Sequence, residues 1–156
     1  PSGAVEEFNR AGIQYRGYLP NFDVPSVLSR FRLTVHIPRR RQAQALPGVP
    51  TIRPFEAMAC GIPLICSPWI DSEGLFAPGE DYLTAGSGRE MADQMRRLLE
   101  DEPMALRQAR RARRTIHARH TCEHRVEQLM DICRELGMAV ADAGPPVSLA
   151  ADPLPA

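Results

Sequence analysis

The feature that most constrains the fold is an uninterrupted apolar run near the middle of the chain, IPLICSP at residues 62–68. Its apolar residues do not alternate with polar ones, so both faces of the strand need cover, as they have in a parallel sheet between helices. The small-residue sequence PFEAMAC at 54–60 precedes the run, and Gly61 is well placed to end a helix there. A helix that leads directly into a buried strand predicts an α/β domain.

The segments on either side continue this alternation of strands and helices. We expect strands at 13–19 and 33–38, a turn with a short amphipathic helix within 20–31, and a short fourth strand at 81–85. Residues 39–50 are too polar and too rich in proline and glycine for either element and predict a loop. This order predicts a Rossmann-like parallel sheet with flanking helices and right-handed crossovers.

The C-terminal third reads as helices followed by a tail. The expected helices are 88–99, a second that Asp101 and Pro103 open, and a last at 122–136 with Thr121 as its N-cap. After that the chain loses periodicity and carries four prolines. We therefore predict one domain over 1–136 and a disordered tail over 137–156.

Composition limits the partners and the compartment. The chain has 156 residues and balances 19 basic with 19 acidic residues, so no overall charge attracts it to nucleic acid. No apolar run approaches the roughly 18 residues that span a bilayer. The four cysteines lack paired CxxC spacing, which fits reduced thiols and predicts a cytoplasmic protein. The first residues resemble the tail of a helix, so we expect a fragment of a longer chain.

A candidate ligand site precedes the buried strand. A helix that begins near Pro54 presents backbone N–H groups and partial positive charge beyond the end of a strand, where open α/β sheets bind ligands. Thr51 and Arg53 can offer a hydroxyl and a guanidinium to a phosphate, and Gly48 lets the backbone come close. Glu56 can accept hydrogen bonds from two ribose hydroxyls. This set predicts a seat for a sugar nucleotide.

A plainer interpretation of these residues stays open. An acidic residue in the first turn of a helix stabilises it by roughly 0.3 to 1 kcal/mol without any ligand, and Arg53 can be an ordinary surface residue. Arg39, Arg40 and Arg41 can neutralise a leaving diphosphate, or they can form a solvated basic loop.

Several stretches together resemble a known family. RPFEAMACGIPLICSPW, EGLFAPGEDYL, a helix ending RRLLED, and ARHTCEHRVEQL are similar to the C-terminal half of the CgeB-like (spore maturation protein) glycosyltransferases of the GT-B group. The resemblance covers about residues 14–136 and is most specific over 51–85. It implies the C-terminal, donor-binding domain of a GT-B fold, with the acceptor held by an absent N-terminal Rossmann-like half.

The resemblance also implies roles for individual residues. Glu56 matches a glutamate that binds the ribose in related enzymes, Thr51 and Arg53 lie where the diphosphate would be, and Gly17 and Tyr18 follow a strand beside the base. One departure concerns the pair of glutamates, separated by seven residues, of many retaining enzymes: Gly48, eight positions before Glu56, stands where the first would be. The donor is expected to be a UDP-, GDP- or similar sugar, with an unknown acceptor, no cofactor and no metal.

Two other groups of residues allow a different interpretation. His117, His120, Cys122 and His124 have zinc-binding chemistry, but the resemblance explains them as a junction between helices. The arginine-rich segment 107–114 is expected to be a solvated helix face rather than an RNA site, because no aromatic residues are interleaved. The function predicted is donor binding in a glycosyltransferase, and the alternative is a non-catalytic Rossmann-like module that binds a nucleotide or a protein.

Overall fold

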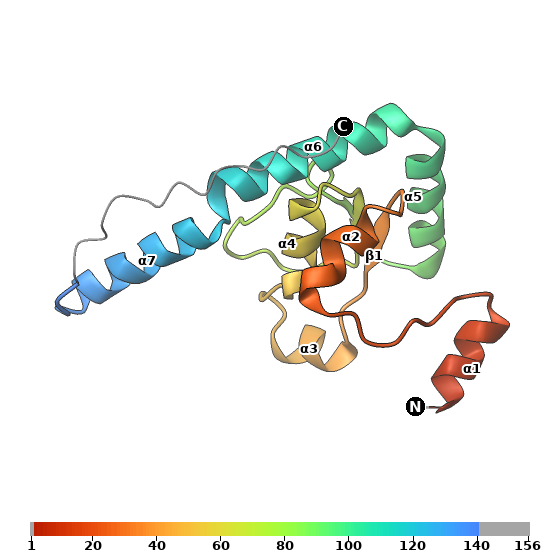
Figure 1. Ribbon diagram of the computed structural model, residues 1–156, viewed down its shortest axis with the longest axis horizontal. Helices are drawn as coiled ribbons and strands as arrows, with labels where there is room; N and C mark the ends of the chain where they lie inside the picture. The colour runs from red at the N-terminus through yellow and green to blue at the C-terminus, as the bar shows by residue number, and fades with distance from the viewer. Residues whose placement is uncertain (1, 141–156) are drawn as a thin grey trace. The chain divides into compact units, whose positions relative to one another are not determined.

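The computed structural model describes residues 2–140, except for the side chains of residues 2, 4 and 42, and Figure 1 shows how its elements follow one another. The elements are α1 (Ser2–Arg10), a 3-10 turn (Asn21–Asp23), α2 (Val24–Leu28), β1 (Thr34–His36), α3 (Arg40–Ala45), α4 (Ile52–Ala59), β2 (Leu64–Cys66), β3 (Leu83–Thr84), α5 (Gly88–Glu100), α6 (Glu102–Arg119) and α7 (Cys122–Glu135).

The chain forms two compact units, one ending at His120 and the other beginning at Thr121. The first unit holds the sheet and six of the helices, and the second holds α7. The single domain over 1–136 and the tail over 137–156 remain predictions, and most of that tail, residues 141–156, lies outside the described residues.

The sheet is parallel, in the order β1-β2-β3, as the sequence pattern predicts. Thr34 pairs with Leu64, and Ile65 pairs with Leu83, so β2 is the central strand. Every residue of β2 is buried. The uniformly apolar run therefore marks the strand that needs cover on both faces.

The side chains of β2 divide the core between two faces of the sheet. Leu64 and Cys66 join a cluster with Met58 of α4 and Ile116 of α6. Ile65 points the other way and joins a second cluster, formed with Leu83, Ala85, Met91, Leu98 and Ala105. The alternation of side chains along a strand thus places α4 on one face and α5 on the other.

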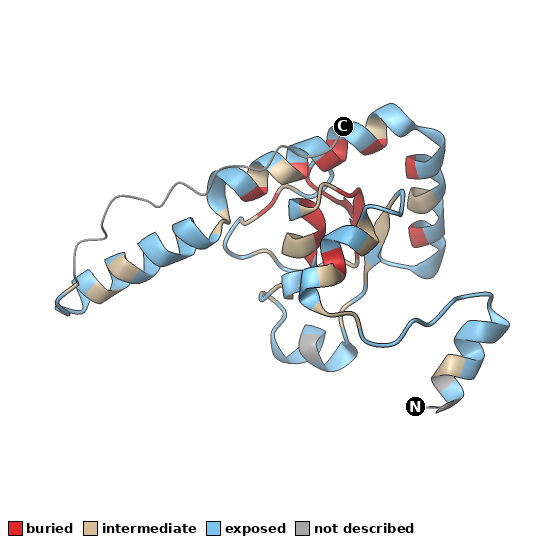
Figure 2. Cartoon of the chain, viewed as in Figure 1, coloured by how far each residue is buried: buried red, intermediate tan, exposed pale blue. Residues whose placement is uncertain are grey.

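The long helix α6 contributes residues to both clusters. Gln108 lies on α6 between Ala105 and Ile116, and its side chain is buried. Its amide accepts a hydrogen bond from the Leu64 N–H at 3.3 Å and donates one to the Leu64 carbonyl at 3.0 Å. Gln108 thereby satisfies the backbone at the first residue of β2, one residue before the pairing with β3 begins at Ile65. Figure 2 shows the buried residues concentrated on the sheet, α4 and one side of α6.

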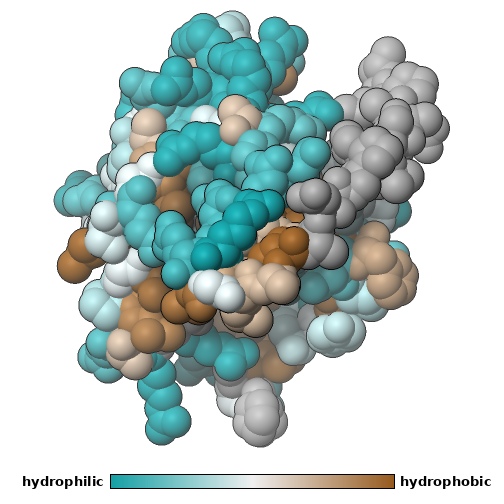
Figure 3. All heavy atoms as spheres, turned by 90° about the vertical axis from the view of Figure 1, so that its left-hand side faces the viewer, coloured by the Kyte–Doolittle hydropathy of each residue, from teal (hydrophilic) through white to brown (hydrophobic). Residues whose placement is uncertain are grey.

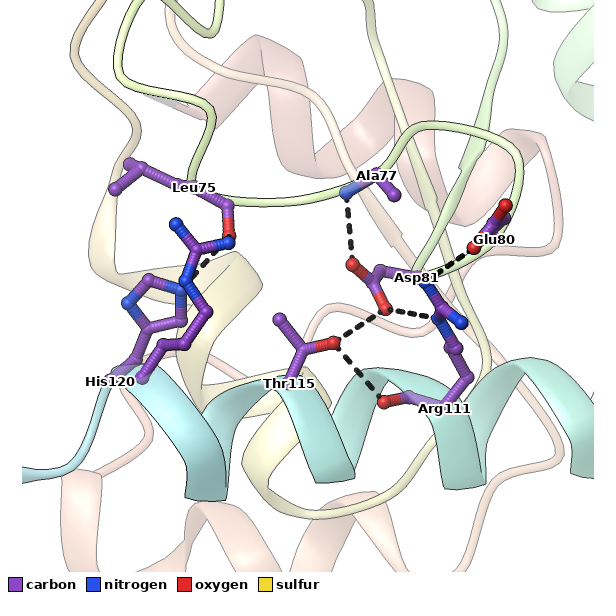
Figure 4. A network of polar contacts seen from close by, with 8 residues as sticks. Leu75, Ala77, Glu80, Asp81, Arg111, Thr115 and His120 are labelled. Carbon is purple, nitrogen blue, oxygen red and sulfur yellow. Dashed lines mark hydrogen bonds and ion pairs between the residues drawn. The ribbon is translucent and has the colours of Figure 1, made fainter.

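A buried carboxylate fastens the loop before β3 to α6. Asp81 accepts hydrogen bonds from the Ala77 N–H at 2.9 Å and from the Thr115 hydroxyl at 2.8 Å, and it lies beside Arg111 (Figure 4). In the same view the His120 ring contacts the Leu75 carbonyl, 2.9 Å from Nε2. Asp81 is 2% exposed, and with these partners its charge is compensated within the protein.

The strand predicted at 13–19 is wrong, because this segment has no regular structure. Gly17 has a φ of 77°, in the left-handed region, which interrupts an extended backbone at the centre of the segment. The apolar side chains of Ile13, Tyr15 and Tyr18 are exposed. The alternating apolar side chains that predicted a half-buried strand therefore do not pack against the core.

The loop predicted at 39–50 is wrong in part, because α3 (Arg40–Ala45) occupies its first half. The sequence RRQAQA consists of residues with high helix propensity. The proline and glycine residues that suggested a loop begin only at Pro47, after the helix has ended.

The second unit consists of α7, whose N-cap is Thr121, as predicted. The Thr121 side chain accepts from the His124 N–H. On the helix, Val126, Leu129 and Ile132 are exposed.

On the face of the molecule drawn in Figure 3, hydrophobic side chains form small groups among hydrophilic ones. None of the helices in the described part of the chain combines the length and apolar character that a membrane crossing needs.

Candidate functional site

The helix before β2 begins two residues earlier than Pro54. Thr51 is the N-cap of α4, and its hydroxyl oxygen accepts a hydrogen bond from the Arg53 N–H at 3.3 Å. Pro54, the third helical residue, has no N–H. Of the first three helical residues, only Ile52 therefore keeps a backbone N–H for a ligand. This helix end is a weaker phosphate seat than the sequence suggested, and Glu56 lies beyond its first turn.

Arg53 and Glu56 form an ion pair on the exposed side of α4. Arg53 Nη1 lies 2.9 Å from Glu56 Oε2, and the two side chains are 50% and 18% exposed. Both residues line a pocket of about 220 Å³ between α2, α4 and β1. Among the described residues, no side chain or backbone N–H donates a hydrogen bond to Glu56 Oε1. Arg53 thus orients a carboxylate that keeps one oxygen available to a ligand.

His36 connects this pocket to a second one. It is the last residue of β1, and its Nε2 lies 3.1 Å from Thr51 Oγ1. The ring lines the pocket beside Glu56 and also an adjacent pocket of about 250 Å³ that Thr51 lines. The second pocket is mostly apolar, with Leu46, Val49, Trp69 and Ile70 among its walls.

The electrostatic setting keeps the His36 ring neutral over a wider pH range than usual. Burial, and to a lesser degree the positive charge of Arg53, lowers the pKa of His36 from its ordinary value of 6.5. The neighbouring strand residue Cys66 stays a neutral thiol, because burial raises its pKa to about 12. The site therefore carries one cation and one carboxylate that compensate each other, beside an uncharged imidazole.

The remaining residues predicted for the site lie around it or away from it. Gly48 lies on the loop before α4, where a Cβ would meet Ser72 Oγ at 3.1 Å. Gly17 and Tyr18 directly precede Leu19, which lines the Glu56 pocket, but they do not line it themselves. Arg39 is exposed and lines neither pocket.

The sequence interpretation missed His36. The available signal was its place as the last polar residue of an apolar strand, at the carboxyl edge of a parallel sheet, where ligands bind. The structure thus brings together Arg53, Glu56 and Thr51 from the predicted set and adds His36 to them.

The histidines and cysteines considered for zinc have other surroundings. His120 packs against the rings of Phe55 and Phe76, with centroids 5.5 and 4.8 Å away. Within residues 2–140, no three His, Cys, Asp or Glu side chains are grouped so that they could hold a metal ion.

Comparison with known proteins gives the family. The profile of a family described as glycosyl transferase-like matches residues 2–131, which is most of the chain. The chain belongs to this glycosyl transferase-like family. None of the curated proteins matches it.

The fold is similar to that of a solved enzyme. Sucrose-phosphate synthase from Thermosynechococcus elongatus matches this glycosyl transferase-like chain with a TM-score of 0.69 and 22% sequence identity. The match covers 87% of this chain and 33% of the synthase, so the chain spans about a third of that protein's length. At this identity the likeness concerns the fold, and it confirms the predicted α/β architecture of the GT-B type.

Proposed function

We propose that this chain supplies the donor-binding part of a glycosyltransferase, of the CgeB-like group, that uses a sugar nucleotide. The observation that carries the proposal is the Glu56 carboxylate, which Arg53 holds at 2.9 Å beside a pocket at the carboxyl end of β1. A carboxylate with one free oxygen suits the paired hydroxyls of a ribose. Family membership independently supports a glycosyl transfer reaction.

The size of the pocket indicates which part of the donor it takes. At about 220 Å³ it is smaller than the roughly 300–1,000 Å³ of pockets that enclose a whole ligand. We therefore assign the nucleoside to this pocket, with Gly17 and Tyr18 toward the base. The diphosphate then lies near Thr51 and Arg53, with Arg39 as a further cation. The second pocket, beyond His36, takes the transferred sugar.

Glycosyl transfer requires stabilisation of the departing nucleoside diphosphate and alignment of an acceptor hydroxyl with the anomeric carbon. Arg53 and the Thr51 hydroxyl supply the first requirement in this proposal. Acceptor binding, and any base for the acceptor hydroxyl, fall to a second Rossmann-like half, which the family resemblance implies. We propose a cytoplasmic enzyme with UDP-, GDP- or a similar sugar as donor.

Calorimetric titration with UDP, GDP and ADP tests the donor site. We expect one of them to bind, and Glu56→Ala to weaken that binding by about tenfold or more, because charge-assisted hydrogen bonds are lost. Glu100→Ala, which removes an exposed carboxylate at the end of α5, is the matched control and should bind as the wild type does.

Two results would contradict the proposal. One is the absence of binding by all three nucleotides at millimolar concentration to folded protein. The other is unchanged affinity in Glu56→Ala. If a nucleotide binds but the chain joined to its second half neither hydrolyses nor transfers the sugar, a non-catalytic binding module is supported instead.

A further inference from the structure

The start of α4 leaves the donor diphosphate short of partners. The Arg53 N–H is already bonded to Thr51, and Pro54 has no N–H. Arg53 is also engaged with Glu56. A diphosphate that passes from the Glu56 pocket to the second pocket must cross the region where these groups meet. Among the described residues, His36 is the one that lines both pockets.

We propose that His36 binds the donor diphosphate in its protonated form and, through Thr51, turns a second hydrogen-bond donor toward it. This inference rests on the proposed function and adds a residue to it. It makes donor binding a proton-coupled step, in which the binding of the anionic diphosphate is accompanied by uptake of one proton on His36.

The hydrogen bonds around Thr51 give the mechanism. A neutral imidazole can accept or donate at Nε2, whereas an imidazolium can only donate. When His36 is protonated, Thr51 Oγ1 therefore accepts from the ring at 3.1 Å and from the Arg53 N–H at 3.3 Å. Both lone pairs of the hydroxyl are then used. Its hydrogen is free to be donated to a phosphate oxygen.

The charges that face His36 make its protonation depend on the ligand. From α4 these are Arg53 and Glu56, which pair with each other, and from β2 the facing group is the Cys66 thiol, which is neutral. Without a ligand, burial and Arg53 keep the pKa of His36 low. A diphosphate adds two negative charges beside the ring, favours the imidazolium and raises its pKa.

The test measures affinity against pH with UDP-glucose, GDP-mannose and ADP-glucose. Both phosphates of these probes are esterified, so they do not titrate near neutral pH themselves. From about pH 8 to about pH 5, we expect wild-type affinity to rise about tenfold, the change that one unit of pKa rise on binding produces. His36→Gln keeps a donor for Thr51 but cannot be protonated. Its affinity should therefore not change with pH, and at low pH it should be weaker than that of the wild type.

Three further variants and one measurement complete the test. Thr51→Val removes the hydroxyl and should lose affinity, and Thr51→Ser, which keeps the hydroxyl, should recover most of that loss. His117→Gln, an exposed histidine on α6, should keep the full pH dependence. Nuclear magnetic resonance titration of wild-type His36, which needs no variant to fold, should show its pKa rising when a probe is bound.

The outcomes separate this inference from the proposed function. If a probe binds in a Glu56-dependent manner, but His36→Gln shows the same pH dependence as the wild type or the His36 pKa does not rise, the role of His36 is refuted and the donor site stands. If no probe and no nucleotide binds, both the proposed function and this inference are overturned.

Discussion

At the residue scale, Gly48 occupies a position with little room for a side chain. A Cβ there would lie 3.1 Å from Ser72 Oγ and 3.4 Å from the Ile70 carbonyl oxygen. The loop at 70–72 already occupies the space that a side chain needs. A glutamate at this position would displace that loop, so in the proposed donor site the contacts to the sugar come from other residues.

Gly48→Ala should therefore lower the free energy of unfolding, by about 1 kcal/mol, because the Ser72 side chain and the Ile70 backbone beside it have to shift. Removing the Ser72 side chain in Gly48→Ala/Ser72→Gly should recover part of the loss. Gly88→Ala, in open space at the first turn of α5, is the control and should be neutral or stabilising. Urea unfolding measures all of these. Equal effects at Gly48 and Gly88 would refute the close contact.

At the element scale, Gln108 joins α6 to the central strand. Its amide bonds both the N–H and the carbonyl of Leu64. Gln108→Leu would keep the volume but leave the buried Leu64 N–H without a partner and remove one hydrogen bond from the Leu64 carbonyl, so we expect a loss of about 1–3 kcal/mol in unfolding free energy. Arg107→Leu, at the exposed neighbouring position, should change it by no more than about 0.5 kcal/mol. A small effect of Gln108→Leu on the unfolding free energy would show that the hydrogen bonds between Gln108 and Leu64 contribute little to stability.

Some of the helices and strands could be predicted from the sequence and others could not. The helix before β2, β2 itself and the caps Asp101 and Thr121 follow from local patterns, and the structure has them. The strand at 13–19 failed because Gly17 bends the chain and no core lies opposite. The role of Gln108 was beyond reach, because the backbone groups that it satisfies are 44 residues away.

The candidate site was predictable only in part, for a similar reason. Thr51, Arg53 and Glu56 lie on one short segment, so their proximity follows from helix geometry. His36 comes from a different strand, and it reaches Thr51 only because β1 lies next to β2. Pairing in a parallel sheet brings together residues that the local pattern does not connect.

At the scale of the whole molecule, His36 should make stability depend on pH. Its pKa is lowered in the folded protein, so the unfolded chain binds the proton more readily. The stabilising contribution is complete above the unfolded pKa of 6.5 and is lost as the pH falls through lower values. Urea unfolding between about pH 5 and 8 should show the wild type losing stability relative to His36→Gln on acidification. A constant difference between them would contradict this assignment.

The measurement that tests the central claim most directly is a crystal structure of the protein with the nucleotide that calorimetry selects. The account predicts the ribose hydroxyls within hydrogen-bond distance of the Glu56 carboxylate, in the pocket between α2, α4 and β1, with the diphosphate beside Arg53, Thr51 and His36. A nucleotide bound elsewhere, with Glu56 still paired only to Arg53, would contradict it.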